Sequence, residues 1–352
     1  MTYSSSKSDF SIEEICQLLE QSPSTLFEQA YDVKKKNVGT DVFLRGLIEI
    51  SNICSRDCLY CGIRKSNHDF IRFRMTKQEI LNAAMWIHKA GYGSLVLQGG
   101  EQRDPGFTDF IEDILKEIKL LSAGALGVTL SLGEQNKDVY AKWFKAGAHR
   151  YLLRIETSNP DLYQKIHPSG YTLDQRIIAL KCLRETGYQV GTGVMIGLPG
   201  QTTRDLASDI LFFKEKDIDM IGMGPYIPHH SSPMYSTPLT RDDKSRFELG
   251  LKMIAATRIV LKDVNIAATT ALQALNSDGR ELGLKAGANI IMPNVTDTKY
   301  RPAYQLYDNK PGIDENSESC RDSLVESIKN LGETIVYNKW GDSKHFHRRI
   351  TN

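Results

Sequence analysis

Residues 53–62 read Ile-Cys-Ser-Arg-Asp-Cys-Leu-Tyr-Cys-Gly and follow a stretch of strand length at 45–51. Three cysteines in this run form a C-x3-C-x2-C pattern: Cys54, Cys58 and Cys61. Three thiolates at such spacing can each hold one iron of a 4Fe–4S cluster, which normally takes a fourth cysteine. The other cysteines are far away in sequence, at Cys16, Cys182 and Cys320. The pattern therefore predicts a cluster with one iron open to an outside ligand.

Two other interpretations of the loop are a zinc knuckle and unrelated thiols. A structural zinc site usually takes four ligands, and His68 could supply the fourth only at a longer spacing than zinc fingers use. Unpaired cysteines are also often simply buried. The clustering of the three thiols and the Gly62 that follows them favour the iron–sulfur interpretation.

An aromatic residue, Tyr60, stands directly before the last cysteine. With it, the loop resembles the signature of radical S-adenosylmethionine (SAM) enzymes, in which the open iron chelates the amino and carboxylate groups of SAM. The resemblance implies two cofactors: one 4Fe–4S cluster on three cysteines, and SAM.

Composition excludes several other classes of protein. The chain has 352 residues, 41% hydrophobic and 25% charged, which suits one globular barrel domain. A net charge of +1 gives no electrostatic footprint for nucleic acid. Six cysteines in this length are no disulfide framework, and a thiolate cluster requires a reducing compartment. The N-terminus has no apolar signal segment, and no apolar stretch could span a bilayer. We therefore expect a soluble, cytoplasmic protein.

The chain from about residue 43 alternates between strand-length apolar runs and helical patterns that end in glycine. The expected strands are 45–51, 94–99, 128–132, 151–156, 190–196, 220–224, 265–270 and 289–293. Eight such units predict an α/β fold, a (β/α)8 TIM barrel of the radical SAM type, with an open doubly wound sheet as the alternative.

The expected domain organisation has three parts. Residues 1–42 comprise a disordered tip (1–10) and two helices at 11–19 and 24–34, residues 43–311 form the barrel, and residues 312–352 form a C-terminal helical extension. The extension should contain a helix at 319–331 and end in a solvated basic tail.

In a TIM barrel, functional residues lie at the carboxyl ends of the strands. The second strand ends in Gln98, Gly99, Gly100 and Glu101, where the glycines allow a close approach of backbone to an amino-acid ligand. The alternative is a plain turn. The fourth strand ends with Arg154 and Glu156 on one face. An arginine can hold a carboxylate bidentately, and Glu156 can accept hydrogen bonds from a ribose or an ammonium. A purely structural ion pair is the alternative.

Hydroxyl groups mark three further strand ends. Thr129 and Ser131 share one face of the third strand, Thr269 and Thr270 end the seventh, and Tyr304 lies in a tyrosine cluster after the eighth. These side chains would suit a small polar or anionic substrate. The alternatives are hydroxyls satisfied by neighbouring backbone for the third strand, and edge packing for the tyrosines.

Two regions could complete a SAM site. Residues on the sixth strand and just after it could bracket adenine with backbone groups and an apolar lip: Met223, Tyr226 and Ile227. Arg176, in the helix after 171–174, could be a second contact to the SAM carboxylate; the alternative is an ordinary exposed arginine. The adjacent His229 and His230 should point apart, which argues against a metal site there.

Taken together, the motifs resemble the HydE family of FeFe-hydrogenase maturases, over about residues 12–340. The resemblance is carried by the cysteine loop and by residues 97–101, 129–134, 151–157, 197–202, 224–229 and 289–294. It implies that Cys54, Cys58 and Cys61 bind the cluster and that Glu156 and Arg176 contact SAM. It further implies that the following residues face the substrate: Arg154, Thr129, Ser131, Thr269, Thr270 and Tyr304.

The chain departs from the family pattern at two positions. Some members carry further cysteines near the C-terminus for a second cluster, whereas this chain has only Cys320 there. A second cluster is therefore not expected. Ile155 stands where some members have a histidine, which could tune the pocket without removing a ligand.

The resemblance implies reductive cleavage of SAM to a 5′-deoxyadenosyl radical that acts on an organometallic substrate made by a partner maturase. The implied partners are the other hydrogenase maturases and an electron donor such as ferredoxin or flavodoxin, with no nucleic acid and no membrane. Two alternatives are a radical SAM enzyme that acts on an amino acid, like methylornithine synthase, and a non-catalytic iron–sulfur carrier.

Overall fold

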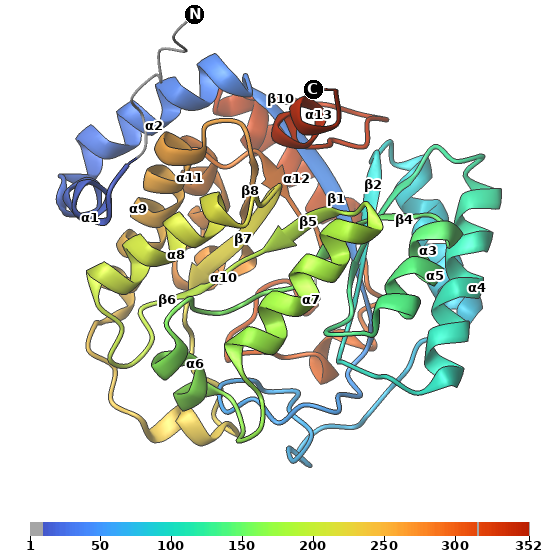
Figure 1. Ribbon diagram of the computed structural model, residues 1–352. Helices are drawn as coiled ribbons and strands as arrows, with labels where there is room; N and C mark the ends of the chain where they lie inside the picture. Colours follow the sequence, from blue (N-terminus) through green and yellow to red (C-terminus); the bar gives the residue numbers. More distant parts are fainter. Residues whose placement is uncertain (1–9, 315–316, 352) are drawn as a thin grey trace, which may run out of the picture.

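Eight parallel strands close into a barrel in the computed structural model, which describes residues 10–314 and 317–351, with backbone alone for 317–320 (Figure 1). The strands in barrel order are β1 (Asp41–Ser51), β2 (Ser94–Gly99), β3 (Gly127–Ser131), β4 (Ala148–Leu152), β5 (Gln189–Thr192), β7 (Met220–Pro225), β8 (Asn265–Ala268) and β9 (Ile290–Ile291). β9 pairs with β1 through Phe43 and Ile290, which closes the ring. The short β6 (Met195–Ile196) pairs with β7. The predicted (β/α)8 barrel is confirmed.

Helices cover the outside of the barrel because each strand is followed by an amphipathic segment with its own start and stop signals. They are α3 (Lys77–Lys89), α4 (Pro105–Leu121), α5 (Lys137–Ala146), α6 (Pro160–Ile166), α7 (Leu173–Thr186), α8 (Thr203–Glu215), α9 (Asp243–Leu261), α10 (Thr270–Leu275) and α11 (Gly279–Lys285). Capping boxes begin α3, α7 and α8 at Thr76, Thr172 and Thr202. Gly147 and Gly187 end α5 and α7 with φ of 124° and 105°, a backbone conformation that glycine adopts at little cost.

Two helices precede the barrel. α1 (Ile12–Glu20) starts at the predicted cap Ser11, and α2 (Pro23–Asn37) packs along α9. A buried ion pair between Lys34 and Glu333, with Nζ–Oε1 of 2.8 Å, ties α2 to the C-terminal segment. The predicted disorder of residues 1–10 falls almost wholly on residues 1–9, which lie outside the described residues.

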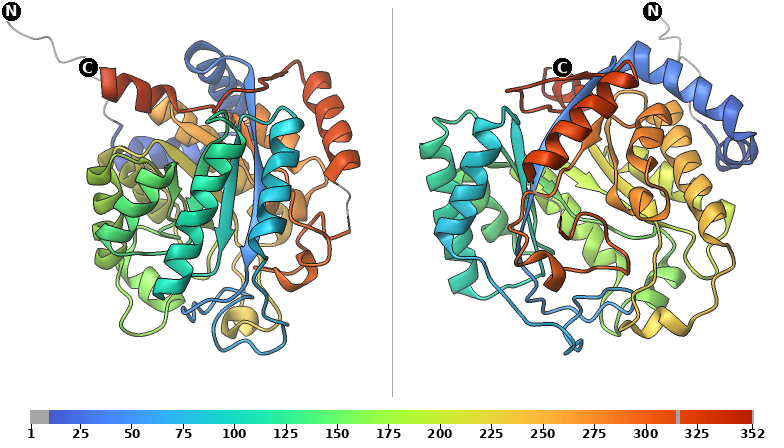
Figure 2. Two further views of the ribbon diagram at one scale, coloured as in Figure 1. Left: turned by 90° about the vertical axis from the view of Figure 1, so that its right-hand side faces the viewer. Right: turned by 180° about the vertical axis from the view of Figure 1, so that it is seen from behind.

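The C-terminal extension is part of the barrel architecture. After the 3-10 turns η1 (Pro233–Ser236) and η2 (Arg301–Ala303) come α12 (Ser317–Asn330), β10 (Thr334–Ile335) and α13 (Lys344–Thr351). β10 pairs with the start of β1, and α12, which packs against β10, lies on the outside of the barrel (Figure 2, right). Residues 340–342 close the amino-terminal end of the barrel, where Arg45 donates to the carbonyl of Gly341 at 2.9 Å. The predicted solvated tail is α13, in which no residue is buried, and an ion pair between Arg349 and Asp219 at 2.7 Å also holds it to the barrel.

Several predicted boundaries were wrong for local reasons. β1 starts at Asp41, four residues before the start of the predicted strand 45–51. β4 ends at Leu152, and the chain after it turns at Glu156, whose φ of 64° interrupts a strand. The predicted strand 190–196 is two strands, β5 and β6, separated at Gly193, which packs directly on the backbone of Gly222. Within the described residues, no helix is long and apolar enough to cross a membrane.

Candidate active site

The cysteine loop lies between β1 and α3, at the carboxyl end of the barrel and opposite α13 (Figure 1). Arg72 organises it with one guanidinium. Its Nη1 donates to the carbonyls of Asn52 and Ile63 at 2.7 and 2.9 Å. Its Nη2 donates to those of Arg64 and Asn67, both at 2.6 Å. A single arginine carries no sequence signal for such a role, so the sequence reasoning missed it.

The three cysteines are half-buried and free of disulfides. Gly100 lets the loop pack on the end of β2, because a Cβ at that position would lie 2.3 Å from the carbonyl oxygen of Ile53 and 2.7 Å from Cβ of Cys54. Burial raises the pKa of all three thiols, that of Cys58 to about 12. A cation is therefore needed to hold them as thiolates.

The spacing of the thiols fits an iron–sulfur cluster better than a single zinc ion. Zinc–thiolate bonds of about 2.3 Å would draw the sulfur atoms to within about 4 Å of one another. Among the described residues, one group of three possible ligand atoms lies within 4.8 Å, and it contains no cysteine: His229, His230 and Asp308. The three thiols therefore do not all lie within 4.8 Å of one another, which disfavours a single zinc ion and leaves room for a cluster with one iron per cysteine.

A buried ion network stands beside the loop. Arg56 pairs with Glu101 and Glu134, with N–O distances of 2.7 and 2.6 Å, and Arg176 pairs with Glu134 at 2.5 Å. Arg103 contacts Glu101 at 3.0 Å from the solvent side. The Glu101 carbonyl also accepts from the N–H of the loop residue Ser55 at 2.8 Å. Glu101 and Arg176, predicted to bind cofactor, thus lie next to the cluster loop and hold each other through Glu134. The sequence reasoning missed the role of Arg56.

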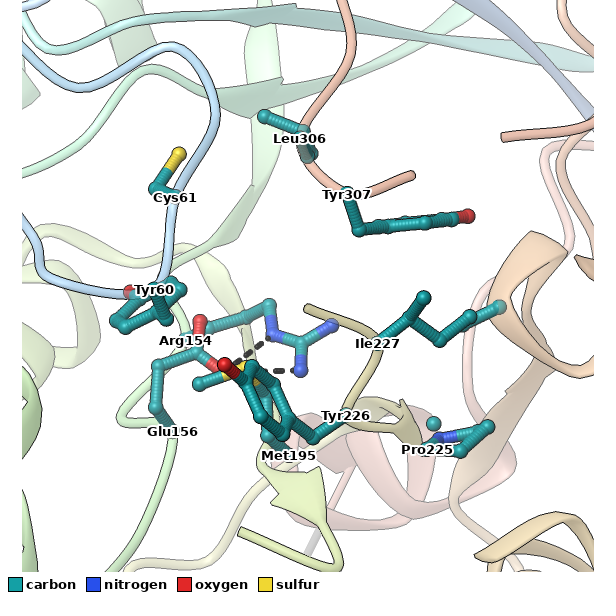
Figure 3. Close-up of a pocket in the computed structure, with 12 residues that line it drawn as sticks. Tyr60, Cys61, Arg154, Glu156, Met195, Pro225, Tyr226, Ile227, Leu306 and Tyr307 are labelled. Atoms are coloured by element: carbon teal, nitrogen blue, oxygen red, sulfur yellow. Dashed lines mark hydrogen bonds and ion pairs between the residues drawn. The ribbon is translucent and has the colours of Figure 1, made fainter. Parts of the chain in front are cut away.

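A cavity of about 130 Å³ opens directly beside Cys61 (Figure 3). Arg154 and Glu156 lie in it with an Nη2–Oε2 distance of 2.9 Å, and Leu306 and Tyr307 lie across from Met195 and Tyr226. The lining residues are Tyr60, Cys61, Arg154, Glu156, Met195, Gly224, Pro225, Tyr226, Ile227, Ala271, Leu306 and Tyr307. The structure thus brings the predicted residues Tyr60, Glu156, Tyr226 and Ile227 together with a cysteine, and we call this space the cluster-side cavity.

Glu156 owes its position to an unusual backbone. Its φ is 64°, and its N–H donates to the Gly193 carbonyl at 3.0 Å, while its own carbonyl accepts from Met195. A non-glycine residue in this region is strained and is found where surrounding structure fixes it, often at functional sites. The turn aims the carboxylate into the cluster-side cavity and toward Arg154.

A second cavity, of about 180 Å³, lies deeper in the barrel. We call it the inner cavity. It contains the predicted residues Gln98, Ser131, Arg154, Thr269 and Thr270. Arg154, Ala271, Leu306 and Tyr307 line both cavities and so form the partition between them. Tyr307 is held by a hydrogen bond between its hydroxyl and Oγ1 of Thr270 at 2.9 Å.

Three of the residues predicted to face the substrate or to bracket adenine line neither cavity. Thr129 is deeper in the barrel, where its hydroxyl accepts from Nε of Arg150 at 2.9 Å. Met223 faces outward to α9, where its sulfur contacts the Thr257 hydroxyl. The alternation along β7 instead turns its neighbouring glycines to the cavities. Tyr304 is buried behind the residues that line the inner cavity, and its hydroxyl accepts a hydrogen bond from Nε2 of Gln98 at 3.3 Å.

Polar residues of the inner cavity were missed by the sequence reasoning. Oε1 of Glu49, on β1, pairs with Lys310. Nδ2 of Asn294 donates to Oε2 of the same carboxylate at 3.1 Å. Lys310 also donates to the Tyr304 carbonyl at 2.9 Å. Glu49 sits two residues before the end of β1, a strand end where such residues are expected. Lys310 comes from an irregular segment, and nothing in the sequence predicts that this segment reaches into the barrel.

The comparisons with known proteins agree with this geometry. The chain matches the radical SAM superfamily over residues 48–213. It is 46% identical, over 92% of its length and 90% of the relative, to the [FeFe] hydrogenase maturase subunit HydE of Thermotoga maritima. The chain belongs to the HydE family of radical SAM enzymes. Enzymes of this superfamily use a 4Fe–4S cluster and SAM, and in this HydE homologue Cys54, Cys58 and Cys61 have the matching pattern.

More distant relatives share the barrel. This HydE homologue is 28% identical to the 3-methylornithine synthase of Methanosarcina barkeri over 87% of its length and 84% of the relative. The crystal structure of methylornithine synthase superposes with a TM-score of 0.81 at 23% identity, covering 94% of this chain and 95% of that one. The maturase HydG of Carboxydothermus hydrogenoformans gives 0.76 at 22% identity, covering 93% and 76%. These two structural likenesses show the fold.

Proposed function

We propose that this radical SAM enzyme acts in the assembly of the FeFe-hydrogenase di-iron site, like the HydE subunit to which it is 46% identical. The observation that carries the proposal is the cluster-side cavity, which places Cys61 and the Arg154–Glu156 pair in one space and meets the inner cavity at a shared wall. A reactive cofactor and a substrate can thus lie side by side.

The reduced cluster and SAM would supply a 5′-deoxyadenosyl radical. The residues of the chain bind, orient and exclude water. Glu156 presents a carboxylate that can accept from the ribose hydroxyls or ammonium of SAM, and Tyr226 and Ile227 offer an apolar surface to adenine. Gly100 and Glu101 contact the cysteine loop and Gly99 packs on the end of β1, so the backbone of these residues can approach the amino-acid part of SAM. Arg176 holds Glu134 and the loop after β4 beside them.

The inner cavity is the proposed substrate site. Its volume suits a small molecule. Arg154 offers a cation at the partition, and Ser131, Thr269 and Thr270 offer hydroxyls. We propose that the substrate is an organometallic iron species delivered by a partner maturase, and that a ferredoxin or flavodoxin reduces the cluster.

The test is an anaerobic maturation assay. Apo-hydrogenase is incubated with the other maturases, SAM, a reduced ferredoxin and this protein, and hydrogen evolution is measured. Activity that depends on this protein, and that is lost with Cys58→Ser, supports the proposal. SAM cleavage without maturation, stimulated by an amino acid such as lysine, would favour a methylornithine synthase-like activity. Cluster transfer without SAM cleavage would favour an iron–sulfur carrier. Such a carrier would not need the cluster-side cavity or the carboxylate of Glu156.

A further inference from the structure

The segment Leu306–Lys310 borders both cavities. Leu306 and Tyr307 line both of them, and Lys310 lines the inner one. The segment has no regular secondary structure. It is attached at its start to the cysteine loop, where the N–H of Gly62 donates to the Leu306 carbonyl at 2.9 Å. The position of this short segment therefore sets the shape of both cavities.

Asp308 fastens the outer side of the segment. Its carboxylate accepts from the backbone N–H of His230 at 3.0 Å and lies 2.7 Å from Nδ1 of the same residue. Its backbone N–H donates to the Pro228 carbonyl at 3.1 Å. Contrary to the sequence expectation, His229 and His230 do not point apart: their rings stack with centroids 4.4 Å apart, and both ring edges lie near Asp308.

The arrangement of His229 argues against a metal ion at this cluster. Its Nδ1 accepts the N–H of Ser231 at 3.1 Å, so in the neutral ring the proton is on Nε2. A metal-bound Nε2 would require the opposite tautomer, with Nδ1 as a donor. The Nε2 atom therefore faces Asp308 as an N–H donor.

This N–H donor has no hydrogen-bond partner among the described residues. His229 is fully buried, and Oδ1 of Asp308 lies 3.9 Å from its Nε2, beyond hydrogen-bond distance. The ring is closely packed on the cysteine loop, because a Cβ at Gly62 would lie 2.7 Å from Nε2. A buried, unsatisfied donor is costly. An inward shift of Asp308 by about 1 Å would satisfy it.

We propose that Leu306–Lys310 is a lid that closes further when SAM fills the cluster-side cavity, and that Asp308 is the positioning residue that locks it by bridging His229 and His230. Closure moves Tyr307 and Lys310, and so couples SAM binding to the shape of the inner cavity. The inference rests on the proposed placement of SAM.

The test is hydrogen–deuterium exchange of the peptide covering residues 305–311, in cluster-loaded protein with and without SAM. SAM should slow exchange in the wild type by about fivefold, the effect of one net hydrogen bond. Asp308→Asn should lose most of this slowing, and Asp308→Glu, which keeps the carboxylate, should retain part of it. The matched control is Asp297→Asn, an exposed acid on the preceding loop that should behave as the wild type.

SAM binding is followed separately by its effect on the EPR spectrum of the reduced cluster. The lid is contradicted if SAM changes the spectrum but not the exchange, or if Asp308→Asn retains full slowing. If SAM leaves the wild-type spectrum unchanged, the proposed SAM site fails and the lid fails with it. A variant that retains the SAM-dependent spectrum is folded, so the loss of slowing can be assigned to the lid.

Discussion

Nη2 of Arg154 lies 2.9 Å from Oε2 of Glu156, and both side chains line the cavity that contains Cys61. Arg154 alone of the two also lines the inner cavity. This ion pair therefore lies at the boundary between the two cavities. The carboxylate faces the proposed cofactor, and the guanidinium faces both the cofactor and the proposed substrate.

Arg154→Ala should therefore separate SAM cleavage from the maturation of hydrogenase. SAM cleavage, measured as 5′-deoxyadenosine, should persist, while maturation of hydrogenase should fall about 10- to 100-fold, the effect of losing a charge-assisted contact to an anion. Glu156→Gln is the matched variant and should weaken SAM binding instead. An equal loss of SAM affinity in both variants would place Arg154 wholly in the cofactor site.

Arg72→Ala should destabilise the cysteine loop, because four backbone carbonyls lose one shared donor group. We expect a lower iron content after anaerobic reconstitution and faster loss of the cluster in air. Arg72→Lys should restore little, since an ammonium cannot reproduce the planar fork. The control is Arg204→Ala, which removes an exposed arginine paired with Glu13. Iron retention equal to that of the control would contradict the role of Arg72.

Asp209 should make stability depend on pH. Burial raises its pKa to about 7, and among the described residues no cation faces it; Ser158 donates to one oxygen at 2.6 Å from its N–H and its hydroxyl. The folded state therefore binds a proton that the unfolded state has released between about pH 4 and 7. Stability from this group is present below pH 4 and falls as pH rises toward and through 7, by about 1.4 kcal/mol per pH unit at most.

Asp209→Asn should flatten this part of the pH profile. Relative to the wild type, the free energy of unfolding of the variant should therefore gain more at pH 8 than at pH 5. Urea unfolding at the two pH values measures the difference. Asp109→Asn, at a surface carboxylate with 66% side-chain exposure, is the control. An unchanged pH profile in Asp209→Asn would show that the buried carboxyl is not protonated in this range.

Cys320→Ala should leave the iron content unchanged, because one cysteine near the C-terminus cannot hold a second cluster. Cys320 lies in the first turn of α12, and its side chain is outside the described residues. Iron and sulfide analysis of the reconstituted protein is the measurement. A drop of about half in the iron content would reveal the second cluster that the sequence argues against.

The sequence predicted the barrel because eight buried strands leave apolar runs and the helices end in glycine, both of which are local signals. It could also place residues on a face of a strand, as with Arg154 and Glu156. The sequence could not predict how deep in the barrel each of these side chains lies. Thr129 and Ser131 share a face, but Ser131 lines the inner cavity while Thr129 lies lower and bonds Arg150.

Contacts between distant segments were beyond reach for a different reason. Lys310 reaches Glu49 across 261 positions through an irregular segment that has no periodicity. The ion network of Arg56, Glu134 and Arg176 also joins residues from three separate loops and helices. Such partners are chosen by the packed fold, and the sequence around each of them has no pattern that predicts the other.

The central claim is that Cys54, Cys58 and Cys61 hold a cluster whose open iron and neighbouring cavity bind SAM. EPR of the anaerobically reconstituted, dithionite-reduced protein, recorded with and without SAM, tests it most directly. The account predicts a 4Fe–4S signal that changes when SAM is added and that is absent in Cys58→Ser. A cluster signal indifferent to SAM, or bound zinc in place of iron, would contradict it.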